Sequence, residues 1–261
     1  MSYREVREFL SLAKGKEFVM FDTETTGLSP ESCDVIEFSA IKVKAKEDET
    51  FTKVAEIDIF INPGYKLPEE IVSITGITDE LLAKEGMSKE AALSKIKAFW
   101  GDCPIITGYN VRFDIRFIES LYSKCGDRFT YEGFIDVMKL AKEKLPKPYK
   151  LVNVCEALSL TGYSFHRSID DARATLDVLL KLLPMYESAP DDKLIVTGCT
   201  RWTKHGFDRI YINNKQNVSA YYDVNTKEWC INGDYEKDEV VAAVLECTGS
   251  EDETALVSAV V

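Results

Sequence analysis

Histidine is scarce in this sequence of 261 residues, and several other features are missing. There are two histidines, no cysteine pair with C-x-x-C spacing, and no run approaching about 18 apolar residues. The seven cysteines, an odd number, argue against a disulfide framework or a cysteine-rich zinc site. The N-terminal stretch MSYREVREFLSLAKG carries charges where a signal peptide needs an unbroken apolar segment. We therefore expect a cytoplasmic protein in a reducing compartment, without membrane association.

An excess of positive charge is also absent. Thirty-two basic residues against 44 acidic ones give a net charge of −12. This balance excludes a chain that is held on nucleic acid or anionic lipid by bulk charge alone, so any polyanion must bind at a local site. The composition is otherwise that of a globular protein, since 45% of the residues are hydrophobic and 29% are charged.

The periodicity of apolar residues predicts an α/β order of elements up to residue 183. The expected helices lie at residues 3–14, 68–99, 111–122, 134–144, 150–160 and 168–183. The expected strands lie at residues 18–21, 35–45, 52–61 and 104–108. Three leading strands followed by alternating strands and helices predict a mixed sheet flanked by helices.

A polar stretch that contains proline, residues 184–192, separates this pattern from a different one. We place a first domain at 1–186, a linker at 187–192 and a small C-terminal module at 193–261. In the module, strand-like segments at 209–212, 219–222 and 229–231 alternate with asparagine-containing turns, and a helix is expected at 236–246. These features predict a small α+β module, an antiparallel meander plus a helix, of unknown role.

Basic and aromatic residues alternate in this module. Between residues 193 and 233, six basic side chains outnumber three acidic ones. The six accompanying aromatic residues are Trp202, Phe207, Tyr211, Tyr221, Tyr222 and Trp229. Such a mixture on a sheet is typical of a platform for single-stranded nucleic acid. A small core with ordinary surface lysines explains the same residues more simply.

Two carboxylates, Asp22 and Glu24, follow the apolar run of residues 18–21. Two residues apart on a strand, their side chains point to the same face, where lone charges are costly to bury. Because neighbouring carboxylates repel, a hard divalent metal with oxygen ligands explains the pair. The alternative is that the strand has ended and both are solvated turn residues.

Two further acids and a histidine each have a structural explanation when taken alone. Asp114 suits the first turn of a helix, and Ser168 with Asp171 matches a capping pattern. His166 precedes Asp171 by five residues; an imidazole can accept a proton near neutral pH, although a lone histidine beside a helix start is more often packed or solvated. We treat the other histidine, His205, as structural.

Taken together, these motifs resemble those of the DEDDh exonucleases. The resemblance is carried by FDTETTGL (21–28), GYNVRFDIRFI (108–118) and HRSIDDARAT (166–175). That family includes the proofreading epsilon subunit of bacterial replicases and the PolC-type exonuclease domain. The resemblance covers roughly residues 17–183 and implies a ribonuclease H-like mixed five-stranded sheet flanked by helices. It leaves the C-terminal module unexplained.

The resemblance also implies a role for each matching residue. The metal-binding acids would be Asp22, Glu24, Asp114 and Asp171, and His166 would be the general base. The terminal sugar and base would be cradled by Thr25, Leu28, Ile74, Asn110 and Phe113. On propensity alone, Leu28, Ile74 and Phe113 suit a core equally well.

Two positions bear on the details of this assignment. Asp170 competes with Asp171, but the family spacing counts five positions from the histidine, and Asp170 would point about 100° round the helix. The family often has His-Asn where this chain has Tyr109-Asn110. That departure leaves the acids untouched and affects the expected shape of the substrate groove.

The implied activity is metal-dependent 3′–5′ exonuclease activity on single-stranded 3′ ends. Two Mg²⁺ ions, with Mn²⁺ as substitute, would assist hydrolysis, and His166 would deprotonate the attacking water to release nucleoside 5′-monophosphates. We expect DNA as the substrate. Trimming of RNA is the alternative, since nothing in the motifs reads a 2′-hydroxyl. A second alternative is a scaffold that binds a polymerase or another replication or repair protein, although retention of all four acids and the histidine argues against it.

Overall fold

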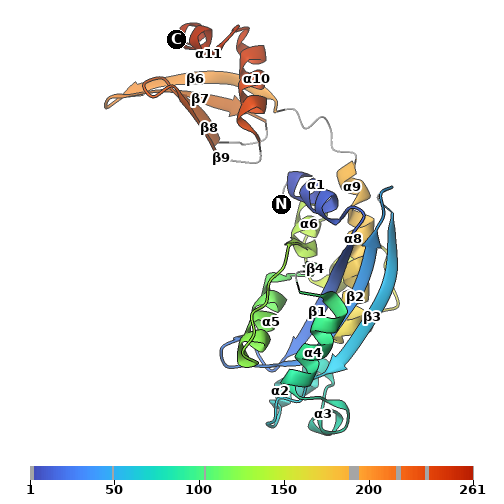
Figure 1. The fold of residues 1–261 in the computed structure, drawn as a ribbon. Coiled ribbons are helices and arrows are strands. Elements are labelled where there is room, and N and C mark those ends of the chain that lie inside the picture. The colour runs from blue at the N-terminus through green and yellow to red at the C-terminus, as the bar shows by residue number, and fades with distance from the viewer. Residues whose placement is uncertain are drawn as a thin grey trace. The chain divides into compact units, whose positions relative to one another are not determined.

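The computed structural model describes residues 3–48, 50–102, 104–187, 194–215, 219–232 and 235–260. The chain divides into two compact units, Met1–Ser188 and Ala189–Val261 (Figure 1). The linker predicted at 187–192 lies outside the described residues, except for Glu187. In the described part of the chain, no helix combines the length and apolar character that crossing a bilayer requires.

A mixed five-stranded sheet forms the centre of the first unit (Figure 1). Its strands are β1 (Glu17–Thr25), β2 (Val35–Ala45), β3 (Phe51–Phe60), β4 (Ile105–Gly108) and β5 (Gly133–Asp136). The order is β3-β2-β1-β4-β5, in which β2 is antiparallel to β1 and β3, β4 is parallel to β1, and β5 is parallel to β4. The strand at the middle of the sheet is therefore β1, which carries Asp22 and Glu24 at its carboxyl end.

Helices cover both faces of this sheet (Figure 1). They are α1 (Tyr3–Ala13), α2 (Glu69–Thr75), α3 (Asp79–Glu85), α4 (Lys89–Trp100), α5 (Arg112–Lys124), α6 (Val137–Lys144), α7 (Leu151–Ala157), α8 (Ser168–Leu182) and α9 (Pro184–Glu187). Phe18 and Met20 of β1 pack with α1, α6, α7 and α8, whereas Val19 and Phe21 pack with α4 and α5. Because β1 is buried on both faces, it is a continuous apolar run, as its sequence predicted.

Two of the predicted helical segments are divided differently in the structure. The helical pattern at 68–99 forms three helices, because Gly76 ends α2 in a left-handed conformation and Thr78 and Ser88 cap the starts of α3 and α4. Residues 134–136, predicted as the start of a helix, belong to strand β5. The side chain of Asp136 accepts a hydrogen bond from the N–H of Met138 and so starts α6 at Val137.

The second unit contains a four-stranded antiparallel sheet in the order β6-β7-β8-β9. Its elements are β6 (Val196–Lys204), β7 (Phe207–Asn214), β8 (Ser219–Asp223), β9 (Glu228–Asn232), α10 (Lys237–Thr248) and α11 (Glu253–Ala259). This arrangement confirms the predicted meander with a closing helix. Strand β6 and helix α11 were not predicted, because β6 is mostly exposed and polar, its register shifts near Gly198, and α11 is only seven residues long.

Candidate active site

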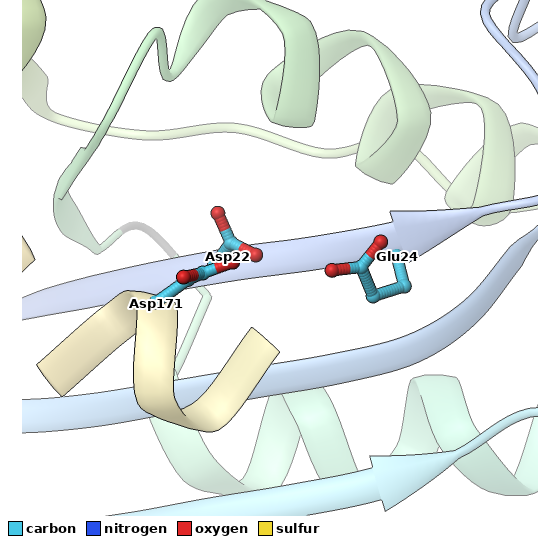
Figure 2. A group of neighbouring side chains, drawn as sticks. All are labelled: Asp22, Glu24 and Asp171. Carbon is cyan, nitrogen blue, oxygen red and sulfur yellow. The ribbon is translucent and has the colours of Figure 1, made fainter. Parts of the chain in front are cut away.

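Three of the predicted acids meet at the carboxyl end of β1 (Figure 2). Asp22 and Glu24 project from the same face of the strand, and Asp171 reaches them from the first turn of α8. One oxygen of each carboxylate lies within 4.8 Å of the others. The fold thus brings together side chains that are far apart in the sequence, and it rejects the alternative in which Asp22 and Glu24 are solvated turn residues.

The fourth predicted acid, Asp114, lies outside this group of three. It sits in the first turn of α5 and is only 3% exposed. Its Oδ1 accepts hydrogen bonds from the backbone N–H and the hydroxyl of Thr23, at 3.1 and 2.7 Å. Among the neighbouring charges, Asp114 makes the largest contribution to the raised pKa of Asp22. The charge of Asp114 therefore belongs to the same electrostatic environment as the three clustered acids.

Burial raises the pKa of all four carboxyl groups above the ordinary range. The pKa of Glu24 rises to about 8, that of Asp114 to about 7 and that of Asp171 to about 6. The pKa of Asp22 is raised well above its usual value by burial and by the charges of the other three acids. Ionising all four near neutral pH therefore requires positive charge between them.

The two carboxylate oxygens of Asp171 differ in their hydrogen bonding within the described residues. Its Oδ2 accepts a hydrogen bond of 3.1 Å from the backbone N–H of His166. Its Oδ1 is buried and has no hydrogen-bond partner among the described residues. A buried carboxylate oxygen left without a donor is unfavourable, whereas hard divalent cations take such oxygens as ligands. The cluster of Asp22, Glu24 and Asp171 therefore fits a divalent metal.

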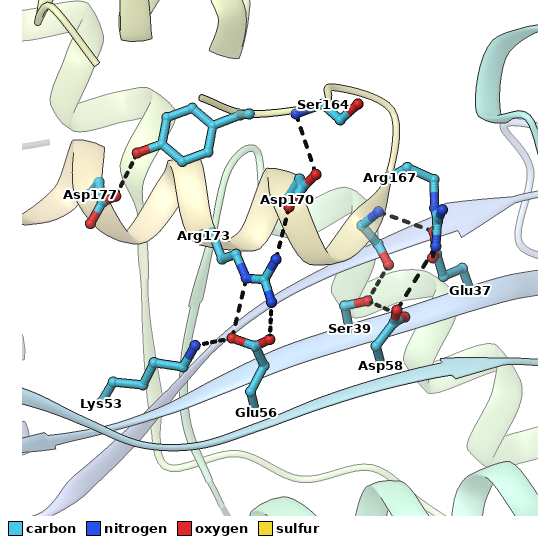
Figure 3. A network of polar contacts seen from close by, with 12 residues as sticks. Glu37, Ser39, Lys53, Glu56, Asp58, Ser164, Arg167, Asp170, Arg173 and Asp177 are labelled. Atoms are coloured by element: carbon cyan, nitrogen blue, oxygen red, sulfur yellow. Dashed lines mark hydrogen bonds and ion pairs between the residues drawn. The ribbon is translucent and has the colours of Figure 1, made fainter. Parts of the chain in front are cut away.

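The competing acid Asp170 is held by other partners (Figure 3). Its carboxylate accepts a hydrogen bond of 3.0 Å from Arg173 and one of 3.3 Å from the backbone N–H of Ser164. Asp170 thus has its own partners at the surface of α8. Of the two neighbouring acids, the structure places Asp171 beside Asp22 and Glu24.

His166 lies in the turn that leads into α8. Its φ of 68° is in the left-handed region, which brings its backbone N–H toward Asp171, and its side chain is exposed. This geometry ties the histidine backbone to one of the clustered acids and leaves the imidazole open to solvent.

Glu37 is a site residue that the sequence analysis missed (Figure 3). In the register of β1 and β2 it lies directly opposite Glu24, and it is fully buried. Arg167 donates two hydrogen bonds to its Oε1, and the backbone N–H of Ser168 donates one to its Oε2. These bonds fix the turn that carries His166 and the start of α8 against the sheet. An acid within the apolar strand 35–45 was the available signal.

The five predicted substrate-binding residues occupy different environments. Leu28 is 83% exposed and Ile74 is 47% exposed, so the core interpretation is wrong for both. Asn110 is exposed and has a positive φ of 58°. Thr25 is buried, and its hydroxyl donates to the carbonyl of Gly27 at 2.7 Å. Phe113 is half-buried, with its ring 4.9 Å from that of Phe117.

Residues 19–179 match the RNase T family, which is described as Exonuclease. This chain belongs to that exonuclease family. The match covers more than half of the chain, includes all four acids and His166, and ends before the second unit. It confirms the family resemblance that the three motifs predicted.

Two relatives of this family member are DNA polymerase III PolC-type proteins. The protein of Pediococcus pentosaceus is 35% identical over 164 residues, which are 62% of this chain and 11% of that protein. The protein of Thermotoga maritima is 34% identical over 178 residues, which are 68% of this chain and 12% of that protein. The chain therefore spans only 11–12% of the length of these relatives.

Solved structures of E. coli exonuclease I share the fold of this family member. The complex of that protein with a dT13 oligonucleotide aligns with a TM-score of 0.56 at 20% identity, over 66% of this chain and 41% of that chain. The complex with a dA16 oligonucleotide gives a TM-score of 0.54 at 20% identity, over 65% and 41%. This likeness confirms the ribonuclease H-like mixed sheet predicted for the first unit.

Proposed function

We propose that the first unit is a 3′–5′ exonuclease that removes nucleoside 5′-monophosphates from single-stranded DNA by two-metal-ion hydrolysis. The observation that carries this proposal is the cluster of Asp22, Glu24 and Asp171 within 4.8 Å, in a chain of an exonuclease family. The buried, unpartnered Oδ1 of Asp171 supports a cation at this place.

The residues that would hold the cations are Asp22, Glu24, Asp114 and Asp171. Two divalent cations, Mg²⁺ or Mn²⁺, would supply neutralisation of the scissile phosphate and activation of the attacking water. The carboxylates contribute oxygen ligands, which suit hard divalent ions. Asp114, anchored by Thr23, would bring its charge to the site from the first turn of α5.

His166 would accept the proton of the attacking water. An imidazole is the usual general base near neutral pH. The hydrogen bond from its backbone N–H to Asp171 keeps this residue beside the clustered acids, and its exposed side chain remains accessible to water.

The five predicted substrate-binding residues would hold the end of the strand. Leu28 follows Glu24 by four residues and offers apolar surface to a terminal base, as does Ile74. Thr25, Asn110 and Phe113 would contact the terminal sugar or base. The DNA polymerase III relatives and the oligodeoxynucleotides bound by exonuclease I support DNA as the substrate and a replication or repair context, beside a polymerase.

The test is degradation of matched single-stranded DNA and RNA oligomers, labelled at the 5′ end, in the presence of Mg²⁺. We expect the labelled DNA to shorten stepwise from its 3′ end and the product to be nucleoside 5′-monophosphate. If the RNA oligomer is degraded about tenfold faster than the DNA oligomer or more, the proposed substrate is RNA and not DNA.

Asp171→Asn should lower turnover by orders of magnitude, because it removes one of the clustered charges. Asp170→Asn is the matched control, since it removes the neighbouring charge, which pairs with Arg173 instead. Equal activity in Asp171→Asn and in the parent protein would show that the site is misassigned.

A further inference from the structure

The sheet of the second unit has one face that its helices do not cover. Along β7, side chains alternate between buried and exposed positions. Ile210 and Ile212 belong to the apolar core formed with α10 and α11. Trp202, Phe207 and Tyr211 lie on the opposite face and are 37%, 47% and 38% exposed. This face, here called the aromatic face, is outside the segment that matches the exonuclease family.

The rings of the aromatic face form two contacting pairs, which Arg209 joins across three strands. Trp202 of β6 is stacked on Phe207 of β7, with ring centroids 6.4 Å apart and planes 27° apart. The guanidinium of Arg209 lies 4.5 Å from the ring centroid of Phe207 and 4.6 Å from that of Tyr221 on β8. The rings of Tyr221 and Tyr211 are 5.4 Å apart. The sheet therefore presents flat rings and one flat cation in an unbroken series.

Charge in the second unit is divided between its two layers. The segment 193–233, which contains the strands, has six basic and three acidic residues. The segment 235–253, which contains α10 and the start of α11, has seven acidic residues and one basic residue, Lys237. The covering helices are thus acidic, and the sheet carries the excess of positive charge.

Three exposed lysines border the aromatic face. Lys204 ends β6, Lys215 follows β7, and Lys227 lies in the turn between β8 and β9. None of them forms an ion pair within the described residues. The acids of this face are Asp223, whose carboxylate accepts a hydrogen bond of 3.1 Å from Arg209, and Glu228. The lysines are therefore available to an external anion.

We propose that the aromatic face binds single-stranded nucleic acid, with bases stacked on the rings and phosphates beside the three lysines. Aromatic rings bind bases of any identity because every base has a flat face, and cations at the border follow the backbone. A protein partner explains the exposed rings but not the flanking unpaired lysines. The binding is independent of hydrolysis in the first unit, so the two proposals fail separately.

The test uses the fluorescence of Trp202 in the full chain, titrated with an oligothymidylate of about 16 nucleotides in EDTA. Trp100 is buried and Trp229 donates a hydrogen bond to Glu253, so Trp202 is the tryptophan that reports on the aromatic face. Subtracting the signal of Trp202→Phe isolates its emission. We expect saturable quenching, because a base stacked on the indole changes its environment.

Four variants identify the surface. Phe207→Ala and Tyr211→Ala should each weaken binding about tenfold, and both side chains are exposed enough for the fold to survive. Lys204→Gln should weaken binding and reduce its salt dependence, because one phosphate contact is lost. Lys237→Gln is the matched control, because it removes one positive charge from the helical layer and not from the aromatic face. It should change neither the affinity nor its salt dependence.

The proposal is overturned if oligothymidylate leaves the emission of Trp202 unchanged, or if Phe207→Ala and Tyr211→Ala bind as tightly as the parent protein. Asp171→Asn, measured in the same titration, should still show the quenching of Trp202, although this variant should have lost hydrolysis. Quenching without any hydrolysis by the parent protein in Mg²⁺ would refute the proposed exonuclease and leave the binding surface in place.

Discussion

Arg167 and Glu37 join the turn before α8 to strand β2 through two hydrogen bonds to a single oxygen. Nε and Nη2 of Arg167 donate to Oε1 of Glu37 at 3.0 and 2.8 Å, and Glu37 has no exposed surface. Since His166 precedes Arg167 and the N–H of Ser168 donates to the same carboxylate, this pair locates the proposed base relative to the sheet.

Arg167→Ala should therefore reduce both stability and turnover. It leaves the buried carboxylate of Glu37 with the N–H of Ser168 as its one remaining donor among the described residues, which costs about 3 kcal/mol in the free energy of unfolding. Arg173→Ala is the matched control, because Arg173 is 44% exposed and pairs with Glu56 and Asp170 at the surface, where pairs contribute about 1 kcal/mol or less. Urea denaturation of both variants gives the comparison. Equal losses in the free energy of unfolding for Arg167→Ala and Arg173→Ala would mean that the pair of Arg167 and Glu37 contributes no more than a surface ion pair.

The metal-free protein should lose stability as pH rises. A carboxyl group with a higher pKa in the folded chain than in the unfolded chain binds more protons when folded, so the free energy of unfolding falls through that interval. For Asp171 the interval runs from about 4 to about 6, and for Glu24 from about 4 to about 8. The Tm in EDTA should therefore decrease between about pH 5 and pH 8.

Divalent cations should reverse this loss. They bind the ionised carboxylates, so Mn²⁺ should raise the Tm strongly at about pH 8 and little at about pH 5. Glu24→Gln should show a shallower decrease in EDTA, because it removes the group whose pKa rises to about 8. A Tm that is independent of pH in EDTA would contradict the electrostatic account of the site.

Leu28→Ala and Ile74→Ala should separate substrate binding from stability. Both side chains are exposed, so the free energy of unfolding should change by no more than about 0.5 kcal/mol. If they contact the terminal base, the KM for single-stranded DNA should rise about tenfold. Val54→Ala, at an exposed apolar position of β3, serves as the control. An unchanged KM in both variants would remove these residues from the substrate site.

The two histidines allow a direct test of the proposed base. Both have a positive φ, 68° for His166 and 53° for His205, and asparagine tolerates this conformation. His166→Asn should lower turnover by about 10² to 10⁴, because the general base is lost, while the backbone N–H still bonds to Asp171. His205→Asn should retain full turnover. Both variants should keep the Mn²⁺-induced rise in Tm, which reports on the carboxylates.

Strand β1 and its two acids could be predicted because their signals are local, whereas the meeting of Asp171 with them was implied by the family motifs. Phe18 to Phe21 form an unbroken apolar run, and the two carboxylates that follow have strand spacing. Glu37 was missed because one acid in a strand indicates a solvent-facing position unless the partner strand is known. Its burial depends on Arg167, which lies 130 residues away. Similarly, β5 is four residues long and precedes a helix without a break, so periodicity assigned it to that helix.

Successive side chains of β1 point to opposite faces of the sheet, so the acid cluster depends on the register of β1 against β2. Asp22 and Glu24 face Asp171, whereas Thr23 between them bonds to Asp114. A slip of β1 by a single residue against β2 would exchange these faces, turning both acids away and offering a threonine to the cations instead. An insertion or deletion of one residue between Phe18 and Asp22 should therefore abolish metal binding even where every acid is retained.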